Sequence, residues 1–302
     1  MNQDAPKEQT QPAPKPTSAA ITEEVIPPAP KIVQNRVEKN GPGTTVPLWR
    51  HQAGSPCVDE FGPSLILLRR LPLKPFRNLA QTTTPDGSRF SLHEHDGDYF
   101  LKLNGLQLMS TTSTSSELEL AEIPCRRLRG HAGSNVLIGG LGLGFSLQRV
   151  LEIVGPGATV HVAELLPEVV QWNKEFLHEV NGRLLEDKRV KVIIQDVHEV
   201  IRLAPKPFYD VILLDVDNGP TSFVQSKNRR LYKWQGLDLI ARTLRPGGKV
   251  AFWSAVVERD FEESLKRAGY QVEAHPAKAH DRAKRFAHMI YVAEPWQAEK
   301  KE

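Results

Sequence analysis

The stretch NVLIGGLGLGFSLQRV, residues 135–150, joins an apolar run to a helical pattern through four glycines in six positions. A glycine-rich turn between a strand and a helix lets the backbone approach a ligand and offers it the N–H groups of a helix N-terminus. Gly140, Gly142 and Gly144 are spaced G-x-G-x-G, whereas dinucleotide-binding loops have G-x-G-x-x-G, and no Lys-Ser/Thr pair follows as in a Walker loop. The stretch predicts a nucleoside-binding turn; a tight turn that binds no ligand is the alternative.

Downstream of this turn, apolar strand patterns alternate with amphipathic helical patterns. The strand patterns are NVLIGG, ATVHVAEL, VKVIIQD, YDVILLDVD and GGKVAFWSA, and a helical segment follows each of them. Such alternation predicts an α/β fold in which a doubly wound parallel sheet is covered on both faces and binds its ligand at the carboxyl ends of the strands. YQVEAHPA and AHMIYVAEP, which follow, predict two antiparallel strands at the sheet edge.

Acidic residues end three successive predicted strands. Glu164 ends the second strand, Asp196 the third and Asp215 the fourth. Acids are depleted in strands, so three of them beside one glycine loop point to a binding site. Glu164 follows Gly144 by 20 residues, where a carboxylate can accept both hydroxyls of a ribose. The alternative for each acid taken alone is a solvated charge at a strand end.

The first part of the chain has a different composition. Residues 1–46 hold eight of the 23 prolines and few aliphatic residues, which predicts a disordered tail. Residues 47–116 read as a small antiparallel β domain, with hairpin turns at Asp96-Gly97 and Asn104-Gly105. A helix is expected over residues 115–128, with a Ser-x-x-Glu start that would cap it. The main domain is then expected over residues 117–296.

Bulk properties exclude several classes of protein. A net charge of +3 and a pI of about 8.8 give no basic field for nucleic acid. No apolar run approaches the roughly 18 residues of a membrane span, and no secretory signal is evident, so we expect a cytoplasmic protein. Cys57 and Cys125 lie far apart, and His93 and His95 have no second ligand cluster, so neither a disulfide nor a metal site is expected.

From about residue 99 to 293 the chain resembles the spermidine synthase (polyamine aminopropyltransferase) superfamily, including its spermidine-synthase-like bacterial branch. The matching stretches are YFLKLNG, VLIGGLGLG, VAELLPEVV, RVKVIIQD, YDVILLDVDNGP and RRLYKWQGL, in the order and spacing of the family. The resemblance implies a small β domain before a Rossmann-like, class I methyltransferase-type catalytic domain. It also implies a transferase that takes decarboxylated S-adenosylmethionine or S-adenosylmethionine as co-substrate and a small-molecule amine as acceptor. Members of the family are commonly dimers or tetramers, and a homodimer is expected here.

The resemblance also implies roles for individual residues. Glu164 would hold the ribose and Asp196 the adenine amino group, while Leu165 and Val197 would flank the ring. Asp215 matches the catalytic Asp, because an amine nucleophile must lose a proton before it attacks and a carboxylate in a closed pocket can accept it.

Two further matches concern the acceptor. Asp217 corresponds to a second Asp in the family's version of this loop. The DVDNGP loop is two residues shorter than in the family, and the alternative is that its residues Asp217 to Pro220 only form a turn. Tyr232 would form a wall of the acceptor pocket, or its ring would only pack beneath the loop.

Two positions depart from the family pattern. Leu143 stands where the family's glycine loop has an Asp that contacts the amino end of the donor. Ser116, Glu117 and Leu118 stand where polyamine synthases have Tyr-His-Glu, so most of the diamine-binding pattern is absent and putrescine is not the expected acceptor. The expected function is aminopropyl transfer to an amine. The alternatives are an S-adenosylmethionine-dependent methyltransferase on the same scaffold and a non-catalytic nucleoside-binding homologue.

Overall fold

The computed structural model describes residues 75–216 and 229–296, which lie in one compact unit within residues 69–302. The predicted disordered tail, the first part of the small β domain and Asp217 lie outside the described residues. The domain boundaries at residues 46 and 116 therefore stay predictions. None of the helices in the described ranges is long and apolar enough to cross a membrane.

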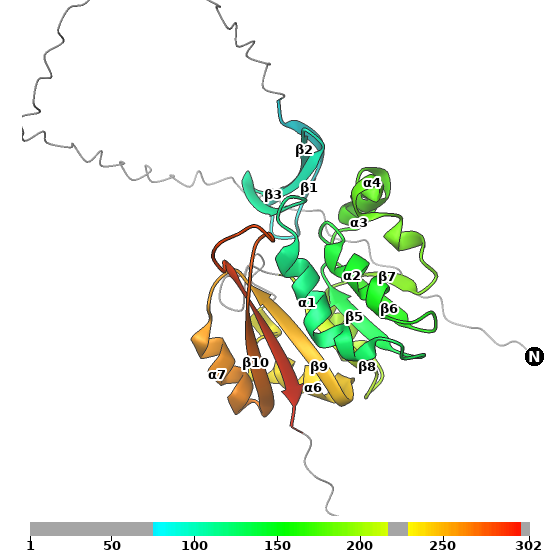
Figure 1. Cartoon of the computed structure of the whole chain (residues 1–302), viewed down its shortest axis with the longest axis vertical. Helices are drawn as coiled ribbons and strands as arrows, with labels where there is room; N and C mark the ends of the chain where they lie inside the picture. Colours follow the sequence, from blue (N-terminus) through cyan, green and yellow to red (C-terminus); the bar gives the residue numbers. More distant parts are fainter. Residues whose placement is uncertain (1–74, 217–228, 297–302) are drawn as a thin grey trace, which may run out of the picture. The chain divides into compact units, whose positions relative to one another are not determined.

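A four-stranded antiparallel sheet forms the N-terminal part of this unit (Figure 1). Its strands follow chain order: β1 (Arg77–Thr83), β2 (Arg89–His95), β3 (Asp98–Leu103) and β4 (Leu106–Ser110). Asp96-Gly97 and Asn104-Gly105 form the two tight turns, and all four residues have positive φ, from 50° to 89°. Two-residue turns of this kind match the twist of the paired strands, and both predicted hairpins are confirmed.

A seven-stranded sheet, in the order β10-β11-β9-β8-β5-β6-β7, forms the main body. The strands are β5 (Asn135–Gly139), β6 (Thr159–Glu164), β7 (Val190–Ile194), β8 (Tyr209–Leu214), β9 (Leu244–Ser254), β10 (Tyr270–Ala277) and β11 (His288–Pro295). The five from β5 to β9 are parallel, and β11 is antiparallel to both β9 and β10. The predicted mixed α/β fold is confirmed.

The expectation that both terminal strands lie at the sheet edge is wrong for β11. This strand inserts between β9 and β10, so that only β10 is an edge strand. The centre of β11, Ile290–Ala293, is buried on both faces, whereas β10 carries several exposed residues. Buried apolar side chains on both faces favour an interior strand, because the edge would leave them partly in water.

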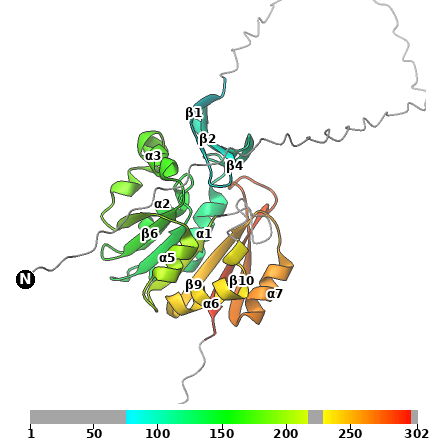
Figure 2. The same ribbon diagram turned by 180° about the vertical axis from the view of Figure 1, so that it is seen from behind.

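Helices cover both faces of the large sheet. On one face lie α1 (Ser115–Cys125), α2 (Phe145–Ile153), α3 (Pro167–Glu175) and α4 (His178–Asn181), with the 3-10 turns η1 (Arg126–Leu128) and η2 (Leu184–Glu186) nearby. On the other lie α5 (Val197–Leu203), α6 (Trp234–Thr243) and α7 (Arg259–Arg267). Figure 1 shows α1 and α2 in front of the sheet, and Figure 2 shows α5 and α6 on the opposite face.

The core consists of two apolar clusters separated by the sheet. In β5, Val136 and Ile138 join the cluster beneath α1 and α2, whereas Leu137 joins the one beneath α5 and α6. Each such side chain, once fully buried, contributes about 1.5–3 kcal/mol through the hydrophobic effect. Trp172, which the helical spacing predicts as a packing residue, is 4% exposed and stacks on Phe90 of the small sheet at 5.9 Å between ring centroids.

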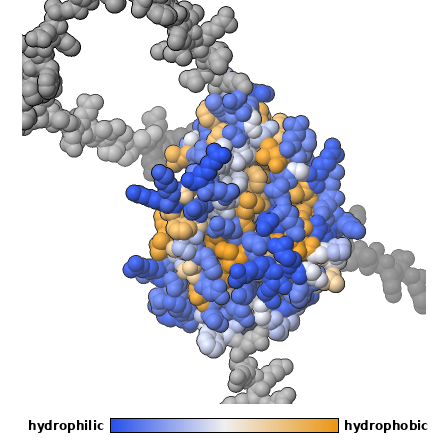
Figure 3. All heavy atoms as spheres, in the orientation of Figure 1, coloured by the Kyte–Doolittle hydropathy of each residue, from blue (hydrophilic) through white to orange (hydrophobic). Residues whose placement is uncertain are grey.

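The surface is mixed in character. On the face shown in Figure 3, hydrophilic and hydrophobic side chains are interspersed. The large hydrophobic side chains that are at least half exposed come from helices, strands and connecting segments across the fold: Phe76, Leu106, Ile194, Leu203, Trp234, Val256, Val257, Phe286 and Trp296. Scattered apolar residues of this kind are ordinary on a folded protein.

The start of α1 differs from the predicted cap. Thr114 is the N-cap residue, and its side chain makes no capping hydrogen bond. The Ser115 hydroxyl instead donates to Asp281 at 2.7 Å, and the Ser116 hydroxyl donates to Glu117 at 2.6 Å. The two serines therefore hold side chains near the helix start and do not cap its backbone.

Candidate active site

The glycine loop lies at the carboxyl edge of the large sheet, between β5 and α2. Gly140, Gly142 and Gly144 all have positive φ, which favours glycine. A Cβ at Gly140 would lie 2.5 Å from the backbone oxygen of Asp215, so no larger residue fits there without moving the backbone. The loop is thus packed against the end of β8.

Two buried asparagines hold the other side of this loop. Asn173 of α3 donates to the carbonyl of Gly142 at 2.9 Å, and Asn181 of α4 donates to that of Leu143 at 2.6 Å. A Cβ at Gly144 would lie 2.7 Å from Asn181 Nδ2 and 3.1 Å from Asn173 Oδ1. Gly144 therefore makes room for these two side chains.

A cavity of about 170 Å³ opens beside the loop. Seven of the residues that the sequence singles out line it: Gly140, Gly142, Glu164, Leu165, Asp196, Val197 and Asp215. Gly144 and Tyr232 are not among its lining residues, and Asp217 lies outside the described part of the chain. The remaining walls include residues that the sequence analysis did not select as site residues: Thr84, Phe90, Leu101, Leu108 and Met109 of the small-sheet region, with Glu117 and Trp253.

Glu164 occupies the end of β6 and is 7% exposed. Its Oε2 accepts from the backbone N–H of Leu141 and its Oε1 from that of Leu166, both at 2.9 Å. Burial raises the pKa of Glu164, and the hydrogen bonds from Leu166 and Leu141 oppose that shift. Because each carboxylate oxygen has two lone pairs, Glu164 keeps acceptor capacity toward the cavity.

Asp196 is the N-cap residue of α5. Its Oδ1 accepts from the backbone N–H of His198 at 2.9 Å, and its Oδ2 pairs with Arg230 at 2.6 Å. The N-cap role by itself is sufficient to explain an acidic residue at this position, and the ion pair with Arg230 compensates the charge of Asp196. A ligand would share Asp196 with both of these partners.

Asp215 follows β8 directly and is partly buried at the cavity wall. Its backbone N–H donates to the carbonyl of Gly139 at 3.1 Å, which ties the strand end to the glycine loop. Its position beside both the loop and the cavity suits a residue that faces a bound ligand.

Tyr232 lies in the second apolar cluster and is 8% exposed. Its ring centroid is 5.9 Å from that of Phe252 and 5.6 Å from that of Phe261. The role of Tyr232 toward an acceptor stays a prediction, as does that of Gly144 toward the donor.

Glu117 and Trp253 are cavity residues that sequence reasoning missed. Glu117, in the first turn of α1, is 6% exposed, and burial raises the pKa of its carboxyl. Trp253, near the end of β9, has a buried Nε1 that finds no hydrogen-bond partner. The only sequence signal for Glu117 was an acid in place of a family histidine, and strand patterns give none for Trp253.

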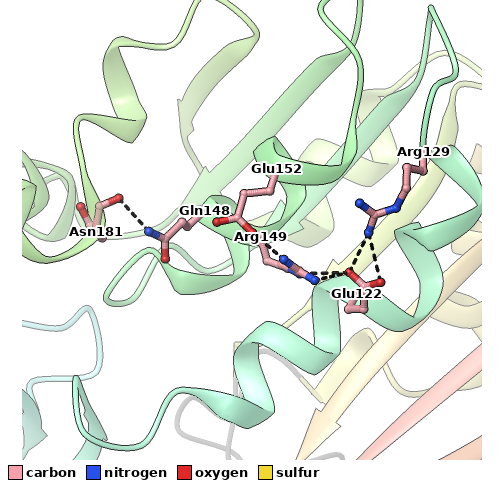
Figure 4. A network of polar contacts seen from close by, with 6 residues as sticks. All are labelled: Glu122, Arg129, Gln148, Arg149, Glu152 and Asn181. Carbon is pink, nitrogen blue, oxygen red and sulfur yellow. Dashed lines mark hydrogen bonds and ion pairs between the residues drawn. The ribbon is translucent and has the colours of Figure 1, made fainter.

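An ion-pair network fixes α1 against α2, as Figure 4 shows. Glu122 of α1 pairs with Arg149 of α2 at 2.9 Å and with Arg129 at 3.3 Å, and Arg149 also pairs with Glu152 at 2.6 Å. Partly exposed pairs of this kind contribute about 0.2–1 kcal/mol each. These ion pairs hold α1 in place, and Glu117, which lines the cavity, is in the first turn of this helix.

The described residues contain no group of three or more His, Cys, Asp or Glu side chains arranged to hold a metal ion. His93 lies 3.0 Å from the Ser91 hydroxyl, within the polar hairpin. Cys125 is a free, fully buried cysteine, and burial raises the pKa of its thiol.

Known proteins with similar sequences support the resemblance. The family model described as "Spermine/spermidine synthase domain" matches residues 120–273. A polyamine aminopropyltransferase of Mycobacterium tuberculosis is 30% identical over 152 residues, covering 46% of this chain and 27% of that protein. One from Prochlorococcus marinus is 34% identical over 82 residues, covering 27% of this chain and 29% of that protein. The matches thus span well under half of these relatives.

Solved structures show the same fold at lower identity. Spermidine synthase from Thermotoga maritima has a TM-score of 0.55 and 18% identity, covering 72% of each chain. A spermidine synthase in complex with the transition state analogue AdoDATO has a TM-score of 0.54 with the same identity and coverage. Since the family match spans half of the chain, we conclude that this protein belongs to the spermine/spermidine synthase family.

Proposed function

We propose that this chain is a spermidine-synthase-like transferase. It binds decarboxylated S-adenosylmethionine or S-adenosylmethionine, and it transfers the aminopropyl group of the decarboxylated donor to a small-molecule amine. The observation that carries the proposal is the convergence of the glycine loop, Glu164, Asp196 and Asp215 on one cavity. The curated relatives named polyamine aminopropyltransferases support the reaction class.

Several features of the cavity support binding of an adenosyl ligand. Gly140 and Gly142 line it without a Cβ, and Glu164 keeps acceptor capacity beside them. Leu165 and Val197 supply apolar surface at the ends of β6 and β7, which suits the faces of a purine ring. In the proposed complex Glu164 accepts from the ribose hydroxyls, and Asp196 accepts from the adenine amino group beside Arg230.

Asp215 is the proposed proton acceptor. When bound, the donor supplies an electrophilic carbon attached to its sulfonium sulfur. Asp215 takes the proton that the acceptor's ammonium loses, so that a neutral nitrogen forms the new C–N bond while the C–S bond breaks and its electron pair stays on sulfur. A fixed carboxylate also holds the cationic amine in line with that carbon. Roles for Asp217 and Tyr232 toward the acceptor, a cytoplasmic location and a homodimer remain predictions.

The test combines binding with product detection. Isothermal titration should show binding of methylthioadenosine, and incubation with decarboxylated S-adenosylmethionine and a panel of amines should release methylthioadenosine. Asp215→Asn should keep the affinity for methylthioadenosine within about threefold and lower turnover by about 10²–10⁴-fold, the usual range for a general base. Formation of S-adenosylhomocysteine from S-adenosylmethionine would instead establish methyl transfer. Absence of binding by any adenosyl ligand would overturn the proposal.

A further inference from the structure

A second cavity, of about 130 Å³, lies on the side of the glycine loop that faces α3 and α4. Its lining consists of Asn173 and Lys174 of α3, His178 and Asn181 of α4, and residues 182–186. None of these residues also lines the cavity of the candidate active site. The two cavities are therefore separate sites within the part of the chain that the structure describes.

Cations outnumber carboxylates in the lining of this second cavity. Lys174 and Arg183 line it, and Glu186 is the only acid among the described residues that do so. Glu186 pairs with Arg183 at 3.3 Å, but their side chains are 67% and 70% exposed, so water screens this pair. Lys174 forms no ion pair with any described residue. The lining therefore carries a net positive charge, which favours an anion.

The imidazole of His178 contributes an unsatisfied polar atom to the same place. Its Nδ1 is buried and has no hydrogen-bond partner among the described residues. Such atoms are rare in folded proteins, because a buried polar group without a partner is costly. His178 lines the cavity together with the two cations, and a small rotation of its ring would let a protonated Nδ1 donate to an anion there.

Two buried amides connect this second cavity to the glycine loop. Asn173 is 4% exposed and Asn181 is 2% exposed, and both line the cavity. Their Nδ2 groups donate to the carbonyls of Gly142 and Leu143, and Gly142 also lines the first cavity. A ligand that holds α4 in place would therefore also stabilise the loop beside the candidate active site. Such coupling is reciprocal, because each ligand changes the affinity for the other by the same factor.

A phosphate group matches the donors around the cavity. Arginine binds phosphate oxygens through paired N–H groups, and lysine binds them as a point charge. A phosphate offers three or four acceptor oxygens, enough for Lys174, Arg183 and His178 together. Because Lys174 and Arg183 are exposed, the phosphate can enter from solvent, and a substituent on it can stay outside.

We propose that the second cavity binds a phosphate group and that its occupation raises the affinity of the first cavity for the adenosyl donor. The phosphate is either free inorganic phosphate or the phosphate of a small ester, since both present the same oxygens to the cavity. Binding of the anion does not depend on the proposed function, whereas its effect on the donor rests on that function.

Isothermal titration of the full chain with inorganic phosphate, at constant ionic strength in a chloride salt, tests the site. Phosphate should bind saturably, and Lys174→Gln or Arg183→Gln should weaken its binding at least fivefold, because each variant removes a charge-assisted hydrogen bond. Lys188→Gln, which alters an exposed lysine outside this lining, is the matched control and should leave the affinity within twofold.

Methyl phosphate distinguishes the two sources of the anion. Binding of methyl phosphate that is as tight as that of inorganic phosphate, or tighter, assigns the site to a phosphate ester. Weaker binding of methyl phosphate assigns it to the free ion.

The coupling is measured with methylthioadenosine as the adenosyl ligand. Its affinity for the wild type should rise at least threefold when phosphate is saturating. The affinity for phosphate should rise by the same factor when methylthioadenosine is saturating. In Lys174→Gln, phosphate at the concentration that saturates the wild type should change the affinity for methylthioadenosine by a smaller factor.

Absence of saturable binding of both phosphate and methyl phosphate would overturn the inference. Equal losses in Lys174→Gln and Lys188→Gln would overturn it too, because they would show a diffuse effect of surface charge. Phosphate that lowers the affinity for methylthioadenosine, or leaves it unchanged, would overturn the coupling. A wild type that binds phosphate but not methylthioadenosine would instead reject the proposed function, so the two failures are distinct.

Discussion

The substitution Glu164→Gln replaces one carboxylate oxygen with an NH₂ group. In the wild type, both carboxylate oxygens of Glu164 accept hydrogen bonds from backbone N–H groups. The N–H groups of Leu141 and Leu166 each donate to one of its oxygens at 2.9 Å. In Glu164→Gln, one of these buried N–H groups faces an amide NH₂ group, and an unsatisfied buried donor costs about 1–3 kcal/mol. We therefore expect the free energy of unfolding to fall by about 1–3 kcal/mol, part of which is offset because no charge is then buried.

The loss of affinity should be larger for ligands that carry a ribose. A hydrogen bond to a charged group contributes about 1.5–3 kcal/mol, so losing the carboxylate should weaken methylthioadenosine binding by roughly 10- to 150-fold. Adenine has no ribose and should lose less than threefold. The assay is isothermal titration of both ligands with the wild type and Glu164→Gln. Glu175→Gln, an exposed carboxylate outside the cavity lining, is the matched control.

Two results would refute this reasoning. Methylthioadenosine affinity within twofold of the wild type, in a folded Glu164→Gln protein, would show that Glu164 does not contact the ribose. Equal losses for adenine and methylthioadenosine would show that Glu164 acts only by holding the glycine loop through Leu141.

Gly140→Ala should lower the free energy of unfolding by more than 2 kcal/mol, because its Cβ would meet the Asp215 backbone oxygen at 2.5 Å and its φ is +88°. Gly142→Ala, whose Cβ would meet the flexible side chain of Met109, should lower the free energy of unfolding by only about 1–2 kcal/mol. Urea denaturation measures both variants, and a larger loss for Gly142→Ala than for Gly140→Ala would contradict the described packing of the loop. Burial lowers the pKa of His161 below 6.5, so the unfolded chain takes up a proton first and stability should fall as pH drops from 6.5 to the folded-state pKa. Between pH 7 and pH 5, the free energy of unfolding of His161→Asn should fall by less than that of the wild type. Parallel curves of this free energy against pH for the two proteins would rule out the contribution of His161.

Much of the site could be predicted from sequence because its signals are local. The glycine spacing determines where the backbone turns, and the acids lie at or just after the ends of strands whose apolar runs are easy to recognise. The carboxyl ends of parallel strands lie at one edge of a sheet, so Glu164, Asp196 and Asp215 had to come together once the fold class was correct.

The roles of other residues depended on their neighbours in space. Gly144 belongs to the glycine pattern, yet in the structure it leaves room for Asn173 and Asn181, which come from helices some 30 residues later. Leu143, which replaces a family Asp in the sequence, is 1% exposed, packs in the apolar cluster and does not line the cavity. Neither outcome could be predicted from spacing, because each is set by long-range packing.

By itself, the sequence determined the fold class, the two tight hairpins and the acids at the strand ends, since periodicity and turn chemistry act over a few residues. Only the tertiary structure decided that β11 inserts inside the sheet, that Tyr232 packs in the core and that Glu117 reaches the cavity. These outcomes depend on which buried surfaces meet, and the free energy of burying them is gained only when distant segments pack together.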